Sequence, residues 1–428
     1  MLLNRNIPPA YQTIDQVKLI DPKVITLDNG IPAHFIEAGT QEILKIDIIF
    51  EAGSWYQPKP PIASATSEML MEGTGEFSSQ QIAEKLDYYG AFIHPQPTKD
   101  FASLSLFTLK KYLPETIKIL EDIVKNPSFP QHELTNFSNK KQQLFIIEME
   151  KVTNIARRAF NEQLFGSLHP YGRNVQLKDY QSLTRNDLLD FHQNYYTPEK
   201  AKIIVTGKTD DAVIQWINQH FGTPDWEKNK KDVPQKKLSG HKIIREKIIK
   251  KANARQSAIR VGIRMPTQTH PDFLKLNILN TILGGYFGSR LMKNIREEKG
   301  YTYGIGSVLI SLKKEGFLVI VSEVGSAYTK KTLHEIFKEI RRLREEKVSP
   351  EELTLVKNYM MGDFLRSFDG PFAISESYRS MLDFHLSMDY FSRVIKTIKS
   401  ITADEIMDLA NLYLIEENFV RTIAGKYE

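Results

Sequence analysis

The chain contains one stretch of sequence twice, and this internal repeat constrains the fold more than any other feature. The segment SLTRNDLLDFHQNYYTPEKAKIIVTGK (182–208) aligns without a gap with SITADEIMDLANLYLIEENFVRTIAGK (400–426). Identical residues align at Ser182/Ser400, Thr184/Thr402, Asp190/Asp408, Tyr195/Tyr413, Glu199/Glu417, Gly207/Gly425 and Lys208/Lys426. A helix, a strand and a glycine in the same register indicate two structurally related halves.

Each copy of the repeat begins with the signals of a helix N-terminus. Thr184 and Thr402 are placed as N-caps, and an acid follows three residues later, Asp187 in one copy and Glu405 in the other. This spacing is the capping-box arrangement. A helical apolar pattern then leads into a short β-branched strand that ends at glycine.

The rest of each half mixes strands with long amphipathic helices. Alternating patterns predict strands at LKIDIIFEAG (44–53), ASLSLFTL (102–109), SAIRVGIRMP (257–266) and GFLVIVSEVG (316–325). Capping signals predict helices at SSQQIAEKLDYYG (78–90) and SPEELTLVKNYMMGDFLRSF (349–368). Because strands and helices do not alternate strictly, we predict an α+β fold with a largely antiparallel sheet packed with helices in each half.

The length of the chain also favours two domains. A chain of 428 residues exceeds the size of one ordinary hydrophobic core. In GTPDWEKNKKDVPQKKLSG (222–240), charged and turn residues replace the periodic pattern. We predict an N-terminal domain at 1–221, a linker at 222–241 and a C-terminal domain at 242–428.

Composition excludes several classes of protein. At 41% hydrophobic and 25% charged residues the chain is globular, and no apolar run is long enough to span a membrane. The absence of cysteine excludes disulfides, thiolate zinc ligands and a cysteine nucleophile. Much of the basic excess lies in 227–251, which we interpret as a solvated linker rather than a nucleic-acid patch. The first residues lack the apolar core of a signal peptide, so we predict a cytoplasmic protein; a trimmed leader would instead indicate the periplasm or an organelle.

Known catalytic motifs are mostly missing. No two of the ten histidines lie within one helical turn of each other, which is the simplest way to converge on a metal. The chain has no G-x-S-x-G elbow, no P-loop and no well-placed G-x-G-x-x-G. The glycine-rich LGGYFGSR (283–290) lacks a phosphate-loop lysine and favours a loop that a second backbone approaches closely.

Three segments carry a resemblance to a known family. FEAGSWYQPKPPIASATSEMLMEGT (50–74), LFGSLHPYGR (164–173) and LGGYFGSRLMKNIREEKGYTYGI (283–305) together resemble the pitrilysin/insulinase-type zinc peptidases. The most similar branch is the half-length one that includes the mitochondrial processing peptidase. The resemblance covers nearly the whole chain and implies the metallopeptidase (LuxS/processing-peptidase-like) fold.

The resemblance also identifies a zinc motif that is degenerate here. In catalytic members H-x-x-E-H supplies two zinc-binding histidines and the glutamate that activates water. The matching positions in this chain are Ser64, Ser67 and Glu68. The family's third ligand matches Glu148, and the acid that supports it matches Lys141. We therefore predict no metal site in this chain.

A second difference from the family pattern affects the edge strand that pairs with substrate in catalytic members. It reads AFIHPQPTKD (91–100), with Pro95 and Pro97 two positions apart. Prolines at i and i+2 remove two successive N–H donors from one side of a strand, which makes a poor template for an added peptide strand. A proline-guarded edge that prevents aggregation is an equal alternative.

The second half retains the family's other functional pair. The resemblance assigns this pair to Arg296 and Tyr303, with Gly300 at the turn between them. In the family the pair contacts the substrate backbone across the chamber. A phenol O–H donates to a carbonyl oxygen that gains negative charge, and a guanidinium holds a neighbouring carbonyl.

Together these features predict the non-catalytic subunit of a heteromeric zinc-dependent peptidase. A related partner with an intact H-x-x-E-H would carry the zinc and form a heterodimer, and Arg296 and Tyr303 would complete its site for peptide substrates. The resemblance places Gly284, Gly285 and Gly288 in a loop that lines the chamber. The chain itself is expected to need no cofactor.

Two alternatives remain open from the sequence. The first is a catalytically inert peptide-binding or scaffold protein of the same fold, found alone or as a homodimer. The second is a self-sufficient hydrolase whose metal site lies elsewhere in the chain.

Overall fold

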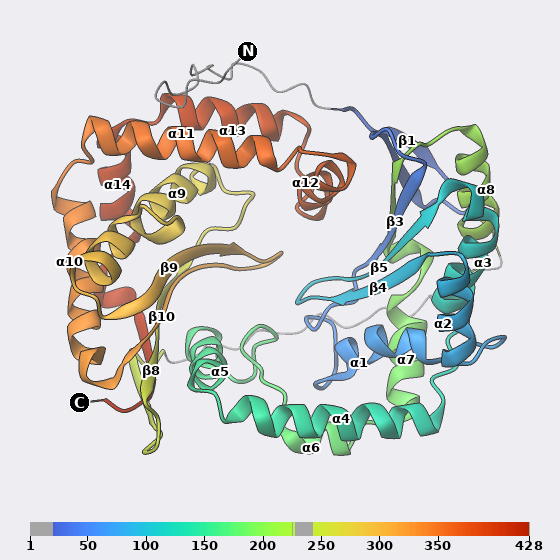
Figure 1. Ribbon diagram of the computed structural model, residues 1–428, viewed down its shortest axis with the longest axis horizontal. Helices are drawn as coiled ribbons and strands as arrows, with labels where there is room; N and C mark the ends of the chain where they lie inside the picture. Colours follow the sequence, from blue (N-terminus) through green and yellow to red (C-terminus); the bar gives the residue numbers. More distant parts are fainter. Residues whose placement is uncertain (1–19, 225, 227–242, 428) are drawn as a thin grey trace, which may run out of the picture.

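The computed structural model describes residues 20–224, 226 and 243–427. It has an α+β fold with two sheets, each packed with helices, and the two halves lie on opposite sides of the view in Figure 1. The predicted fold class is thus confirmed. No helix within the described ranges is both long and apolar enough to cross a membrane.

The two sheets share the same strand order. The first sheet runs β1 (Lys23–Thr26), β2 (Pro32–Glu37), β6 (Ala201–Gly207), β3 (Ile43–Phe50), β5 (Ala102–Leu109), β4 (Phe92–Pro97). The second runs β7 (Glu246–Lys250), β11 (Val420–Gly425), β8 (Gln256–Met265), β10 (Gly316–Gly325), β9 (Thr302–Ser311). Apart from the extra β1, the sheets correspond strand for strand. In each, the one parallel pair joins the repeated strand to its neighbour, β6 to β2 and β11 to β7.

Helices surround both sheets. The first half contains α1 (Ile62–Met69), α2 (Ser79–Tyr88), α3 (Leu113–Lys125), α4 (Gln131–Met149), α5 (Val152–Phe165), α6 (Leu177–Gln181), α7 (Arg185–Tyr195) and α8 (Asp211–Phe221). The second contains α9 (Phe273–Asn280), α10 (Thr329–Glu345), α11 (Pro350–Arg366), α12 (Pro371–Asp383), α13 (Asp389–Ser400) and α14 (Ala403–Tyr413). Two π-helical segments follow α9, namely η4 (Thr281–Gly285) and η5 (Met292–Glu298). Short 3₁₀ turns are η1 (Leu70–Glu72), η2 (Lys110–Tyr112), η3 (Pro198–Lys200), η6 (Ser326–Tyr328) and η7 (Glu416–Asn418).

The repeated helices begin where the sequence predicts. The side chain of Thr184 caps α7 and that of Thr402 caps α14, each within a complete capping box. The same box forms between Ser78 and Gln81 at the start of α2. These local hydrogen bonds satisfy backbone donors that a helix start would otherwise leave unpaired.

Each half has its own hydrophobic core on the outer face of its sheet. In the first half, buried side chains of β3, β5 and β6 meet α1, α3, α7 and α8. In the second half, β8, β10 and β11 meet α9, α10 and α14. The inner face of each sheet is therefore left for another element to cover.

One helix from each half covers the inner face of the other half's sheet. Helix α5 packs on β8 and β11, and helix α12 packs on β6 and β2; both lie towards the middle of Figure 1. Phe160 of α5 is fully buried over Gly262 of β8, where an added Cβ would lie 2.5 Å from the ring. This exchange joins the halves through packed side chains rather than through the linker alone.

The contact of α12 with the first sheet contains buried charges. Lys45 and Asp47 of β3 lie 3.0 Å apart as an ion pair, and both are buried. Glu376 of α12 also pairs with Lys45, and Ser105 of β5 donates to Asp47. Paired and hydrogen-bonded charges of this kind fix one arrangement of the two elements.

The proposed domain boundaries remain a prediction. Helix α8 ends at Phe221, immediately before the predicted linker at 222–241. Most of that linker, residue 225 and residues from 227 onward, lies outside the described residues. The two sheets fall on either side of it along the chain.

Replacing Phe160 by alanine should weaken the junction between the halves. We expect Phe160→Ala to lower the free energy of unfolding by about 3–5 kcal/mol, because it opens a cavity over Gly262. Urea-induced unfolding measures the loss. Leu168→Ala is the control, since Leu168 is 83% exposed and should change little. Equal midpoints for the two variants would contradict the role of α5 as a structural junction.

Three buried histidines should make the fold sensitive to mild acid. Burial lowers the pKa of His34, of His169 and of His192 from 6.5 to about 4 in each case. The unfolded chain therefore takes up protons that the folded chain does not bind. The free energy of unfolding should fall as the pH drops from about 6.5 to about 5.

Urea midpoints across that pH range test this expectation. His34→Gln should reduce the pH slope, whereas His132→Gln should leave it unchanged because the His132 side chain is exposed. A midpoint that does not change with pH would show that these rings are not kept neutral by the fold.

Candidate functional site

The degenerate zinc-motif positions lie on α1, where the family's metal ligands would be expected. Ser64 is half-buried, and its hydroxyl donates to the carbonyl of Pro61 over 3.0 Å. Ser67 is completely buried one turn further on. Hydroxyl groups in these places are weak ligands for zinc compared with imidazole and carboxylate.

Glu68 is held by a lysine instead of a metal. Its carboxylate lies 2.6 Å from Nζ of Lys141 on α4, and both side chains are partly exposed. The same ammonium lies 5.2 Å from the ring centre of Phe137. Burial raises the pKa of Tyr180 nearby, and the negative charge of Glu68 raises it further. An ammonium group therefore lies directly beside the carboxylate of Glu68.

Glu148 does not reach this pair. It lies near the C-terminal end of α4, two helical turns or about 10 Å along the axis from Lys141. Its carboxylate accepts hydrogen bonds from Lys151 at 2.8 Å and from Asn154. The bond from Lys151 is the main reason that the pKa of Glu148 lies below its usual value. The structure therefore brings Glu68 together with Lys141 and leaves Glu148 apart.

The side chains at these positions do not form a ligand set for a zinc ion. Two hydroxyls, one carboxylate already paired with an ammonium, and a distant glutamate lack the converging ligands that zinc requires. Across the described residues, no group of three or more histidine, aspartate or glutamate side chains is placed to hold a metal.

Arg296 and Tyr303 are brought together across the corner between η5 and β9. Gly300 adopts a φ of 65° at this corner, a left-handed conformation that glycine accommodates without strain. The Arg296 side chain donates from Nε to the backbone carbonyl of Tyr303 over 3.1 Å. Its guanidinium lies 4.5 Å from the ring centre of Phe287. The backbone bond and the aromatic ring together fix the position of the arginine.

Tyr303 projects outward because β9 bulges at this point. Ser322 of β10 pairs with Ile305, and Val324 pairs with Thr302, so two β9 residues, Tyr303 and Gly304, lie opposite one residue of β10. A bulge of this kind turns a side chain away from the regular alternation of the sheet. The Tyr303 side chain is 96% exposed, and its phenol has no hydrogen-bond partner among the described residues.

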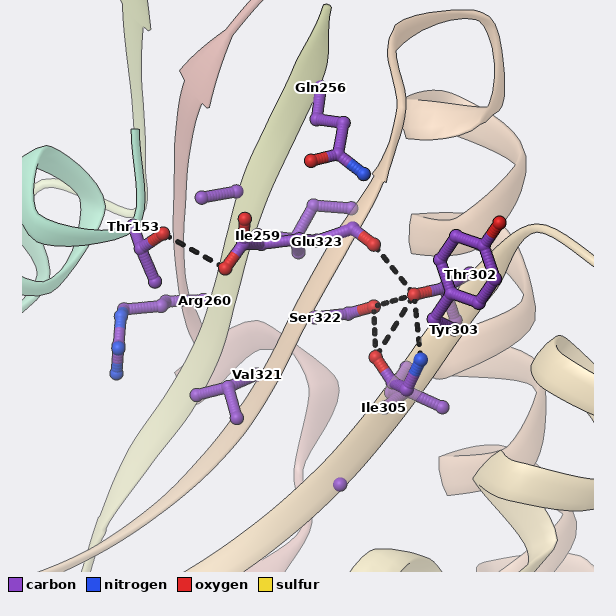
Figure 2. Close-up of a pocket in the computed structure, with 13 residues that line it drawn as sticks. Thr153, Gln256, Ile259, Arg260, Thr302, Tyr303, Ile305, Val321, Ser322 and Glu323 are labelled. Carbon is purple, nitrogen blue, oxygen red and sulfur yellow. Dashed lines mark hydrogen bonds between the residues drawn. The ribbon is translucent and has the colours of Figure 1, made fainter. Parts of the chain in front are cut away.

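A hydroxyl network holds the bulge in place. The Thr302 hydroxyl lies within hydrogen-bond distance of the Glu323 carbonyl, at 2.6 Å, and of the Gly304 N–H, at 3.1 Å. The Ser322 hydroxyl lies 2.9 Å from the Gly304 carbonyl. Figure 2 shows these bonds converging beside the tyrosine ring. The exposed phenol is thus carried by a locally fixed backbone.

The tyrosine stands at a cavity of about 480 Å³ over the inner face of the second sheet. Thr153 from the start of α5 forms one side and donates to Glu323 over 2.9 Å. Several residues that line the cavity are small, including Ala258, Gly304 and Gly306, and their short side chains leave its floor open. The cavity therefore lies between elements of both halves.

The predicted chamber loop has three different environments. Gly284 is buried, and an added Cβ would lie 2.6 Å from the backbone nitrogen of Ser307 on β9. Gly285 lines a second cavity of about 590 Å³ between β9, α9 and α11 to α13. An added Cβ at Gly288 would lie 2.8 Å from the ring of Tyr286. The close approach that Gly284 allows is thus to a neighbouring strand of the same chain.

The β9–β10 hairpin is anchored to the first half at its tip. The backbone N–H of Lys313 donates to Asp100 over 2.9 Å, and the hydroxyl of Tyr171 donates to the same carboxylate. Nδ1 of His169 accepts the N–H of Tyr171 over 3.1 Å. LFGSLHPYGR therefore holds the hairpin that carries Tyr303, a role that sequence reasoning missed although it singled out this segment.

The bulge partner Glu323 and the cavity residue Arg260 were also not anticipated. Both lie in strands that the alternating pattern predicts correctly, yet nothing in that pattern marks them as site residues. Only the pairing of β10 with β9 and β8 brings them beside Tyr303.

Comparison with known proteins identifies the family. Residues 35–169 match the family described as insulinase (peptidase family M16), and residues 182–360 match the peptidase M16 inactive domain. An uncharacterized zinc protease of Bacillus subtilis is 22% identical, over 92% of this chain and 96% of its own. The mitochondrial-processing peptidase subunit beta of Dictyostelium discoideum is 21% identical, over 69% of this chain and 63% of its own.

A solved structure agrees with these matches. The crystal structure of a peptidase M16 inactive domain from Pseudomonas fluorescens superposes with a TM-score of 0.86 at 22% identity, covering 96% of this chain and 99% of that one. The matched segments include both halves, the degenerate motif on α1 and the corner that carries Arg296 and Tyr303. The resemblance seen in the sequence is confirmed, and the chain belongs to peptidase family M16.

Proposed function

We propose that this chain is the non-catalytic subunit of a heteromeric zinc-dependent peptidase. The observation that carries the proposal is the contrast between its two site regions. Glu68 is neutralised by Lys141, whereas Tyr303 presents a free phenol beside Arg296 at an open cavity. A related subunit with an intact H-x-x-E-H would supply the zinc and the activated water.

In this proposal Tyr303 acts as a hydrogen-bond donor to the substrate. A phenol O–H placed at a peptide carbonyl stabilises the negative charge that develops there during hydrolysis. The bulge at Gly304 holds the phenol away from the sheet, so donation needs no rearrangement of β9.

Arg296 would hold a neighbouring carbonyl of the same peptide. Its Nε is already bound to the backbone of Tyr303, and its Nη1 lies 3.8 Å from Glu297. The two terminal nitrogens retain donors for a substrate oxygen. The arginine therefore positions both the bulge and the peptide.

The similar proteins also support this assignment. One relative is described as a subunit of a processing peptidase, and the match described as an inactive domain covers the second half only, residues 182–360. Others are described as zinc proteases, which is the activity expected of the partner.

A catalytically inert peptide-binding or scaffold protein is the second candidate. The edge strand β4 favours it, because Pro95 and Pro97 remove N–H donors from the first sheet's outermost strand. This candidate predicts no peptidase partner and little effect of changes at Arg296 or Tyr303.

Removing the phenol hydroxyl should slow the assembled peptidase. We expect Tyr303→Phe to lower kcat by about 100-fold, because one transition-state donor is lost while the ring remains. The measurement is cleavage of an unstructured peptide by the complex reconstituted with its H-x-x-E-H partner.

The matched control is Tyr88→Phe, since Tyr88 is also exposed, at 82%, but lies in the first half away from the cavity. Co-purification with the partner should be unchanged in both variants. If Tyr303→Phe keeps full activity, the scaffold candidate is favoured instead.

The chain alone should not depend on zinc for its stability. The Glu68–Lys141 pair replaces metal ligation, so chelation with EDTA and addition of zinc should both leave the melting temperature unchanged. Elemental analysis of the purified chain should find less than stoichiometric zinc. Stoichiometric zinc, together with a lower melting temperature after chelation, would instead indicate a metal site built from other residues.

A further inference from the structure

The second cavity, of about 590 Å³, lies wholly within the second half. It is enclosed by β9, α9, η4 and the helices α11, α12 and α13. It shares no lining residue with the cavity beside Tyr303. Its volume lies in the range of sites that hold small molecules.

A buried amide without a partner lines this second cavity. Asn280 is the last residue of α9, and it is only 5% exposed. Its Oδ1 is buried and has no hydrogen-bond partner among the described residues. Buried polar atoms of folded proteins are nearly always paired, so an exception beside a cavity indicates a group that the chain itself does not supply.

The backbone that follows Asn280 leaves its amide open to the second cavity. The π-helical segment η4 begins at Thr281, and such segments are frequent at functional sites. Gly285 ends this segment, and an added Cβ there would lie 3.1 Å from Nδ2 of Asn280. Gly285 does not have a left-handed φ, so its conformation does not require glycine. Because both residues line the cavity, the missing side chain leaves the amide accessible.

The charges around the second cavity favour an uncharged ligand. Within the described ranges, no lysine, arginine or histidine lines it, whereas Asp363 and Glu376 do. Asp363 is paired with Arg366, and Glu376 is paired with Lys45. A carboxylate or phosphate would meet two negative groups and no cation on the wall, and an ammonium would compete with the existing partners.

The remaining wall defines the rest of the ligand. Much of it is apolar and comes from three helices, with Met360, Phe364, Met381, Phe391, Val394 and Ile398. Methionine side chains adapt their shape to what they contact. The amide of Asn280 offers one acceptor and a donor group in one plane. A second amide presents the matching N–H and C=O and can pair with it through two hydrogen bonds.

We propose that the second cavity binds an uncharged ligand that carries an amide group on an apolar body, with Asn280 as the residue that recognises the amide. The amide belongs to a small molecule or to a residue within a peptide chain. The inference does not rest on the proposed peptidase role, because the Tyr303 cavity takes no part in it.

Three probes test the proposal by isothermal titration calorimetry with the full-length chain at neutral pH. They are N-acetyl-phenylalaninamide, its acid N-acetyl-phenylalanine, and an acetylated pentapeptide N-methylamide with phenylalanine between glycines. We expect the small amide to bind about tenfold more tightly than the acid. Binding of the pentapeptide alone, lost in Asn280→Leu, would support the site with a peptide chain as its source. Equal or tighter binding of the acid, or no binding of any probe, would overturn the proposal.

Substitution at Asn280 identifies the site. Asn280→Leu keeps the shape of the side chain without its amide and should abolish the preference for the amide probe. Gly285→Ala places a methyl group beside Nδ2 and should weaken the same preference. Asn136→Leu is the matched control, since Asn136 is exposed on α4 in the first half. A preference that survives in Asn280→Leu would overturn the assignment.

Thermal unfolding separates recognition from a structural role. The melting temperature of Asn280→Leu should stay constant or rise, because the substitution removes a buried polar atom without a partner. A marked fall would show that the amide serves the fold and would overturn the proposal. Tyr303→Phe should bind the amide probe as the unmodified chain does. Loss of binding in that variant would place the probe in the other cavity and overturn the proposal as well.

Discussion

The arrangement of the molecule depends on the exchange of α5 and α12 between the two sheets. Neither half covers the inner face of its own sheet, so each face is completed by a helix from the other half. Phe160 packs directly against Gly262 in this exchange, where an added Cβ would lie 2.5 Å from the ring. Since α5 also carries Thr153, the helix that stabilises the junction also forms one side of the cavity beside Tyr303. The same helix therefore supports the second sheet and shapes the cavity.

The two contacts of this exchange differ in chemistry. The side chains between α5 and the second sheet are mostly apolar, including Phe160, Leu164 and Val319. Between α12 and the first sheet there are ion pairs instead: Glu376 with the buried Lys45, and the largely buried Asp383 with Lys202 of β6 at 3.4 Å. Apolar packing tolerates small shifts, whereas a buried ion pair loses much of its stabilisation once its geometry is disturbed. Relative movement of the halves should therefore cost more at α12 than at α5.

Local signals in the sequence predicted the elements, and long-range pairing determined the site. The caps at Thr184 and Thr402 and the alternating strands involve residues close in the chain, so the fold class and the repeat could be read directly. The bulge at Tyr303 depends on which β10 residues pair with β9, and the Glu68–Lys141 contact depends on how α4 lies against α1. Neither contact leaves a local pattern. The resemblance identified Arg296 and Tyr303 as a pair. It could not show that the Arg296 side chain donates a hydrogen bond to the backbone carbonyl of Tyr303.

The pairing of Glu68 with Lys141 also limits how this chain could regain a metal. Replacing Glu68 alone would leave the ammonium of Lys141 without its counterion. Introducing histidines while Lys141 remains would place a fixed positive charge next to the incoming cation. Metal ligation at this place would therefore require changes on both α1 and α4. A tethered ammonium beside Glu68 thus opposes the binding of an exchangeable cation at this place.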